Sequence, residues 1–378
     1  MNLSEVLKKR MDEWVFIELK EPVSIPKSQG VIPSNLPLPI RTETMAGWVK
    51  TDIGTDIQLD NLIVDLAMIM GIDESFLHYQ TYHNLLEELT NHQIQAALQQ
   101  KVQLFFDLEM PDNAMILLRT LTFLYPKNQE LQFSYAVSIE RFAEKRIKEG
   151  ADRAGTYLYD LASKEYLRLI QESPELYAAH YKLGHYYVYS KQYRGAKHQF
   201  QRFLDLIANQ ENLDEIKQEV VETLQAINPY ALYEEAVAYS QASRFEEAIL
   251  LLESLTSEEK QWWQAELLLG ICYRGVNQLG KAMTHMRRSE FLKEGEPMVL
   301  FEVAQTLYIS GKYEEAMESI QKTIGAEREW PVAYLVRAQI NLALNQVRDA
   351  ISDLHQVLKL DPEQAAAKEL LSKLGQDS

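Results

Sequence analysis

The chain has 378 residues, of which 46% are hydrophobic, and a formal net charge of −17. This hydrophobic content, together with only 15 Gly and 12 Pro residues, excludes a disordered or fibrous chain. The length exceeds what a single hydrophobic core usually serves, so we expect several domains or an elongated array. Nucleic acids and anionic membranes both attract basic surfaces, so the acidic balance argues against either as a partner.

The cysteine content and the hydropathy pattern indicate the compartment. Cys272 is the single cysteine, which rules out an internal disulfide or a cysteine-based zinc site. Charged residues among positions 1–10 interrupt the place where a signal peptide needs its apolar core. No stretch approaches the roughly 18 apolar residues of a membrane span. We therefore expect a soluble, cytoplasmic protein.

Residues 1–54 are expected to form a helix followed by an extended arm. Asn2 and Glu5 have the spacing of a capping box, which begins a helix. This helix would bury one face, formed by Leu3, Val6, Leu7, Met11 and Trp14. Proline fixes φ and biases the residue before it toward extended geometry. An extended arm is therefore predicted where five prolines gather, namely Pro22, Pro26, Pro33, Pro37 and Pro39.

A short helical pair is expected over residues 55–94. Asp60 caps a helix that ends at Gly71, and Asp73 caps a second helix. Both segments carry apolar residues at helical spacing, which gives each helix one face for packing. We expect the pair to dock on the repeats that follow.

Beyond residue 228 the sequence repeats itself every 34 residues. Two columns of small residues mark this register: Ala236, Gly270, Ala304 and Ala338, and then Ala248, Ala282, Ala316 and Ala350. Paired helices approach to about 8–10 Å only where small side chains occupy the crossing, and larger neighbours fill the space between repeats. The period therefore predicts stacked antiparallel helical hairpins.

The same pattern recurs earlier in the chain, where it is most complete. It consists of Leu183, Gly184 and Tyr187, followed by Tyr193, Ala196 and Phe200. On these residues the chain resembles the tetratricopeptide repeat family, whose pattern is W-x₂-L-G-x₂-Y followed by A-x₃-F. The resemblance implies an all-α, right-handed α-solenoid of about seven helix-turn-helix units, with a C-terminal capping helix and an irregular N-terminal extension.

The units are expected in two blocks. The first block, 95–210, contains units at about 95–128, 129–176 and 177–210, and the second, 229–362, contains units at 229–262, 263–296, 297–330 and 331–362. Fourteen extra residues lengthen the second unit, either as a harmless variation or as a prong that contacts a partner. Residues 211–228 are expected to form an inserted helix, and residues 363–378 a capping helix and tail.

No arrangement of residues in the sequence nominates an enzyme. His78 and His83 lie five residues apart, as do His180 and His185, whereas metal ligands on one helix need a spacing of three or four. No phosphate-binding glycine loop, dinucleotide fingerprint or nucleophile elbow is present. We therefore expect no catalytic residue, no metal site and no cofactor.

The resemblance implies that the first helix of each unit lines a concave groove where ligands bind. The corresponding positions are Tyr181, His185, Tyr189, Tyr230, Tyr233, Arg274, Phe301, Gln305 and Tyr308. The lysines and asparagines with which some family members clamp a chaperone's C-terminal carboxylate are absent. The face is aromatic and apolar, which suits an extended apolar peptide or an amphipathic helix. Individual members of this set either bind the ligand or only pack between helices.

The expected function is a non-catalytic scaffold or adaptor that binds another protein or peptide. The proline-rich arm at 22–40 is itself a candidate occupant of the groove, either in its own chain or in a second copy. The alternative is an intracellular peptide sensor that resembles tetratricopeptide response-regulator phosphatases or quorum-peptide receptors. The N-terminal region shows neither the three-helix bundle nor the helix-turn-helix expected of those regulators.

Overall fold

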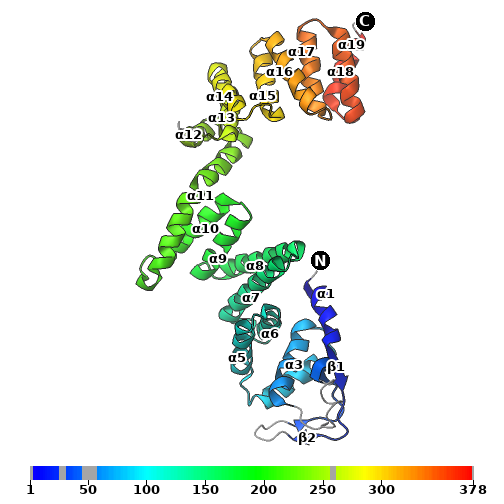
Figure 1. The fold of residues 1–378 in the computed structure, drawn as a ribbon, viewed down its shortest axis with the longest axis vertical. Coiled ribbons are helices and arrows are strands. Elements are labelled where there is room, and N and C mark those ends of the chain that lie inside the picture. The colour runs from blue at the N-terminus through cyan, green and yellow to red at the C-terminus, as the bar shows by residue number, and fades with distance from the viewer. Residues whose placement is uncertain (1–2, 25–30, 45–57, 256–260, 377–378) are drawn as a thin grey trace. The chain divides into compact units, whose positions relative to one another are not determined.

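The structure is a computed structural model that describes residues 3–24, 31–44, 58–255 and 261–376. Figure 1 follows these residues along the chain, and after residue 58 nearly all of them lie in α-helices joined by short turns. Within these described ranges, no helix combines the length and the apolar character needed to cross a membrane. The architecture is an all-α solenoid with a small, partly extended N-terminal region.

The chain divides into two compact units. Unit 1 contains residues 1–190 and 198–214, and unit 2 contains residues 191–197 and 215–378. Each unit has hydrophobic clusters of its own.

Unit 1 begins with a small N-terminal module. Its elements are α1 (Leu3–Lys8), a 3-10 helix (Lys9–Glu13), β1 (Trp14–Ile17), β2 (Val23–Ser24), β3 (Val31–Ile32), β4 (Leu38–Arg41), α3 (Leu59–Ile72) and α4 (Tyr79–Leu89). β1 pairs with β4 in antiparallel register, with Trp14 opposite Arg41 and Ile17 opposite Leu38. β2 and β3 form a second two-stranded sheet.

The N-terminal helix is shorter than predicted. It ends at Lys8, the 3-10 helix continues the chain, and Trp14 begins a strand instead of completing a helical face. The residues Trp14–Ile17 are all aromatic or β-branched, which favours a strand when a partner such as β4 is available. Asn2, half of the predicted capping box, lies outside the described residues.

The proline-rich arm packs on the N-terminal module. Leu36 and Leu38 are 3% and 0% exposed and belong to the same hydrophobic cluster as α3. The hydroxyl of Tyr82 on α4 donates a hydrogen bond to the carbonyl oxygen of Pro37. The described part of the arm thus covers α3 and α4, which corrects the expectation that it occupies the repeat groove of its own chain.

A buried carboxylate connects the strands to α3. Asp65 is 5% exposed, and its Oδ1 accepts hydrogen bonds from Trp14 Nε1 at 2.9 Å and from Arg41 Nε at 3.2 Å. The Arg41 guanidinium also lies 4.9 Å from the centre of the Trp14 ring. Burial raises the pKa of Asp65, while the hydrogen bonds from Trp14 and the charge of Arg41 oppose that shift.

The raised pKa of Asp65 predicts a pH effect on stability. The folded protein binds this proton more tightly than the unfolded chain, so its stability rises as the pH falls through the folded pKa. Asp65→Asn removes the titrating group but keeps an amide oxygen as acceptor. Denaturant titrations between about pH 7 and pH 4 should show wild type gaining free energy of unfolding relative to the variant as acid is added. A difference in free energy of unfolding between wild type and Asp65→Asn that stays constant with pH would contradict the raised pKa of Asp65.

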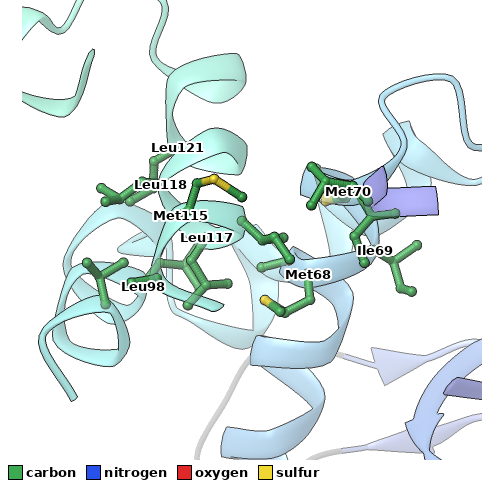
Figure 2. Packing of buried hydrophobic residues seen from close by; sticks show 14 of the residues in the cluster. Met68, Ile69, Met70, Leu98, Met115, Leu117, Leu118 and Leu121 are labelled. Carbon is green, nitrogen blue, oxygen red and sulfur yellow. The ribbon is translucent and has the colours of Figure 1, made fainter. Parts of the chain in front are cut away.

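The N-terminal module docks on the repeats through α3. Figure 2 shows Met68 of α3 facing Met115 and Leu117 of α6 and Leu98 of α5, whereas Ile69 and Met70 lie on the side of α3 farther from α6. Thr120 Oγ1 donates to the carbonyl oxygen of Ala67 at 2.6 Å. At Gly71, an added Cβ would lie 2.3 Å from the backbone oxygen of Ile116. The two helices therefore touch backbone to backbone at this glycine.

Three helical hairpins follow. Their helices are α5 (Ile94–Asp107), α6 (Pro111–Leu124), α7 (Gln129–Lys148), α8 (Asp152–Glu172), α9 (Tyr177–Tyr189) and α10 (Tyr193–Leu206). The hairpin of α7 and α8 is the long one, with helices of 20 and 21 residues. Gly150 turns the chain between them with a φ of 77°, a value that glycine adopts without strain.

The lengthened hairpin contacts the N-terminal helix of its own chain. The backbone N–H of Leu3 donates to the hydroxyl of Tyr157 on α8 at 3.0 Å. Arg10 donates to Asp112 at 3.2 Å and to Asn113 at 2.7 Å, both on α6. The first turns of α8 thus contact α1 through Tyr157, and α6 contacts the following 3-10 helix through Asp112 and Asn113.

The helices of unit 2 extend the same hairpin pattern to the C-terminal end of the described chain. They are α11 (Asp214–Gln241), α12 (Phe245–Leu255), α13 (Trp263–Gly275), α14 (Leu279–Leu292), α15 (Pro297–Ile309), α16 (Tyr313–Ala326), α17 (Pro331–Ala343), α18 (Val347–Leu360) and α19 (Ala365–Gln376). Every alanine of the two small-residue columns is 0% exposed. At Gly270 an added Cβ would lie 2.7 Å from Met286 Cγ, so the small side chain permits the close approach of α13 and α14.

The inserted helix expected at 211–228 is not a separate element. Residues Glu211–Leu213 form a short 3-10 helix, and α11 then runs without a break through Pro229. Ile227 and Ala231 lie one turn apart on either side of the proline and are 5% and 1% exposed. Burial of these two residues stabilises α11 across Pro229, the residue at which the repeat unit 229–262 was expected to begin.

Candidate functional site

The nine predicted groove residues are distributed over both units. Tyr181, His185 and Tyr189 lie on α9 in unit 1. The other six lie on α11, α13 and α15 in unit 2.

The three residues of α9 follow each other at intervals of one helical turn. The Tyr181 ring lies 4.5 Å from His185 and 5.3 Å from Phe203, and His185 lies 5.0 Å from Phe200. Tyr181 and His185 are therefore partly packed against α10. Tyr189 is 53% exposed, and its ring stacks on Tyr159 of α8 at 4.9 Å.

A cavity of about 260 Å³ opens beside this face, between α7, α8 and α9. It is lined by Glu140, Glu144, Tyr159, Ala162, Ser163, Tyr166, Lys182, His185, Tyr186 and Tyr189. Two of the predicted residues, His185 and Tyr189, thus border a concave site. Sequence reasoning missed the residues from α7 and α8, because it assigned ligand contacts only to the α9 face of this region.

Part of the cavity wall is polar and carries hydrogen-bonded carboxylates. Glu140 accepts hydrogen bonds from the Tyr166 hydroxyl at 2.5 Å and from Lys182 Nζ at 3.1 Å. The Tyr159 hydroxyl lies 3.4 Å from Glu144 Oε1. Burial raises the pKa of Tyr166, and the negative charge of Glu140 raises it further. Burial likewise raises the pKa of Tyr159, with Glu144 as the next cause. Both phenols therefore stay protonated and can only donate to the carboxylates.

In unit 2 the aromatic residues gather around a tryptophan that sequence reasoning also missed. Trp262, in the turn before α13, lies 5.4 Å from the ring of Tyr230 and 4.8 Å from that of Tyr233. Tyr193 lies 5.0 Å from Tyr230, which is 48% exposed. Burial raises the pKa of Tyr233. The four rings form an aromatic cluster with one exposed face at Tyr230.

The remaining predicted residues of unit 2 are mainly structural. Arg274 donates to Glu302 Oε2 at 2.6 Å and to Thr306 Oγ1 at 3.0 Å. The ion pair with Glu302 balances the positive charge of Arg274. Phe301 is 5% exposed and its ring lies 4.6 Å from Trp330. It therefore belongs to the core between α15 and α17, which corrects its assignment to a binding surface.

Gln305 and Tyr308, the last two predicted residues, are half-buried on α15. The Tyr308 ring lies 5.7 Å from that of Tyr313 on α16. Tyr308 thus packs within its own hairpin while part of its surface reaches solvent.

The described residues include one cysteine, Cys272. Cys272 is 0% exposed, and burial raises the pKa of its thiol, whereas a nucleophilic cysteine needs a lowered pKa and access. In the ranges given above, no three His, Cys, Asp or Glu side chains gather in a way that could hold a metal ion.

The 34-residue period, the antiparallel hairpins and the buried columns of small residues define the class of protein. The chain has the fold of a tetratricopeptide-repeat α-solenoid. Neither a comparison with protein-family models nor one with curated proteins found a match.

Several solved structures of tetratricopeptide proteins are similar to parts of this chain. The structure of PilW, a type IV pilus biogenesis factor, is 17% identical, covers 62% of this chain and 98% of its own, and gives a TM-score of 0.40. PilF of Pseudomonas aeruginosa is 14% identical over 65% of this chain and 100% of its own, with a TM-score of 0.39. YrrB, a protein with an unusual peptide-binding site, is 14% identical over 55% and 97%, with a TM-score of 0.38.

Proposed function

We propose that the chain is a non-catalytic scaffold or adaptor that binds a polypeptide segment on the α9 face of unit 1. The observation that carries this proposal is the position of Tyr189, half-exposed and stacked on Tyr159 at the rim of a cavity. Tyrosine combines an apolar ring with a polar tip and is enriched among residues that dominate binding energy. A stacked pair also loses little side-chain freedom when a ligand covers it.

The aromatic cluster of unit 2 is a second candidate contact. Tyr230 exposes its ring while Tyr193, Tyr233 and Trp262 hold it in place. Flat aromatic surfaces of this kind suit an extended, apolar peptide.

The identity of the occupant is narrowed by the N-terminal module. Because Leu36 and Leu38 of the arm are already buried against α3, the proposed ligand is another polypeptide and not this arm. A second copy of the chain stays a prediction, as do the cytoplasmic location and the alternative role as a peptide-sensing regulator.

Peptide selection tests the proposal. A display library of random peptides is selected against the full chain, and the dissociation constants of the enriched peptides are measured by fluorescence anisotropy. Tyr189→Ala and Tyr159→Ala should each weaken binding by about tenfold or more, because each removes half of a rigid aromatic contact.

Phe291→Ala provides the control, since Phe291 is an 82% exposed aromatic residue on α14, outside both candidate sites. It should change the dissociation constants by less than about twofold. Equal effects of the three substitutions, or the failure of any peptide to bind the full chain, would contradict the proposal.

A further inference from the structure

We propose that the cavity between α7, α8 and α9 takes the guanidinium group of an arginine side chain on the bound polypeptide. This inference rests on the proposed function and adds the chemistry of one partner residue. It is carried by the size of the cavity, by its balance of charge and by the two stacked rings at its rim.

The cavity has room for one side chain. Its volume of about 260 Å³ lies below the range of roughly 300–1,000 Å³ that holds small-molecule ligands. Tyr189 stands at its rim and is half-exposed, whereas Tyr166 is 1% exposed. A polypeptide lying over Tyr189 would therefore insert one long side chain beside the stacked rings of Tyr159 and Tyr189.

The charge of the cavity favours a cation. Glu140 and Glu144 lie one turn apart on α7, and both line it. Lys182 forms a salt bridge with Glu140 at 3.1 Å, so these two charges offset each other. In the part of the chain that the structure describes, Glu144 forms no salt bridge, and its contact with the Tyr159 hydroxyl is a long 3.4 Å. Among the described residues the carboxylate of Glu144, which lines the cavity, is therefore left without a cationic partner.

The rings favour arginine over lysine. Tyr159 and Tyr189 stack at 4.9 Å with 24° between their planes, Tyr189 is 53% exposed, and Glu144 lines the same cavity. A planar guanidinium can lie on such a ring while its N–H groups donate to a carboxylate. An ammonium group is more strongly hydrated and cannot stack in this way. The net charge of −17 adds a long-range attraction for a basic partner.

A small probe tests the cavity without any selected peptide. Nα-acetyl-arginine amide is titrated into the full chain carrying ¹³C-labelled tyrosine, and Nα-acetyl-citrulline amide, a neutral molecule of nearly the same shape, is titrated in parallel. The resonances of Tyr159 and Tyr189 should shift with the arginine probe and not with citrulline. Glu144→Gln should abolish the shifts, whereas Glu130→Gln, an exposed position on the same helix, should retain them.

Selected peptides supply the second measurement. In the wild type, exchanging the relevant arginine for citrulline should raise the dissociation constant by about tenfold or more, and in Glu144→Gln by less than about twofold. Peptides that bind but contain no such arginine, together with an unresponsive small probe, would overturn the arginine assignment and leave the proposed function standing. If no peptide binds at all, the proposed function fails as well. Tyrosine shifts with the citrulline probe of equal size would also overturn the assignment.

Discussion

Phe200→Ala is expected to lower the free energy of unfolding of unit 1 by about 3–5 kcal/mol, the usual cost of removing a buried phenylalanine. Phe200 is 0% exposed and fills the space left by Gly184 on α9, where an added Cβ would lie 2.6 Å from Phe200 Cε1. Its ring also packs edge-on to His185 at 5.0 Å. Truncation therefore leaves a cavity beneath the candidate binding face.

Denaturant unfolding, read out by hydrogen exchange in α9 and α10, measures this effect. Gly184→Ala tests the same contact from the other side, because its new methyl group clashes with the ring of Phe200. The free energy of unfolding that the double variant Gly184→Ala/Phe200→Leu loses should be smaller than the summed losses of the single variants Gly184→Ala and Phe200→Leu. Strict additivity would show that the glycine and the ring do not depend on each other.

Gly71→Val is expected to detach the N-terminal module from the repeats, with a loss of about 3 kcal/mol. The atom nearest to the added Cβ is the backbone oxygen of Ile116 at 2.3 Å, which cannot move without displacing α6. Separation of α3 and α6 would also break the hydrogen bond from Thr120 to Ala67 and that from Arg119 to the Gly71 carbonyl oxygen.

Hydrogen exchange over residues 59–72 and limited proteolysis measure the detachment. Gly325→Ala is the matched control, because Gly325 lies in α16 with no atom within 4 Å of an added Cβ. That substitution should be neutral or stabilising by up to about 1 kcal/mol, since alanine favours a helix more than glycine does. Equal protection of α3 in wild type and Gly71→Val would refute the proposed role of the glycine.

The regular part of the fold was predictable because its signal recurs. The column that contains Ala248 and Ala316 marks helix crossings, and helix packing requires small residues there whatever the rest of the sequence does. Single-copy features lacked such a signal. Trp14 fits a helical face in the sequence, but the partner strand 38–41 that draws it into a sheet is distant in the chain. At Pro229, where a repeat unit was expected to begin, the helix continues because neighbouring residues such as Ile227 and Ala231 are buried.

The candidate site was predictable only in part, for a related reason. The repeat register identifies positions on α9, so it located Tyr189. Glu144 lies in the lengthened end of α7, where the register has no column, and Tyr159 takes the bulky position three residues before Ala162, which the register assigns to packing. Their role depends on the packing of α7 and α8 against α9. Phe301 shows the converse limit, since a position in the right column became core when Trp330 packed on it.

Site-specific photo-cross-linking tests the central claim most directly. A photoreactive phenylalanine analogue is placed at position 189 of the full chain in its native cells, and the same analogue at position 291 serves as the exposed control. We predict a discrete cross-linked polypeptide at position 189, lost when Tyr159→Ala is added and competed by the selected peptides. Cross-linking at position 189 that does not exceed that at position 291, or that persists in the Tyr159→Ala background, would contradict the account.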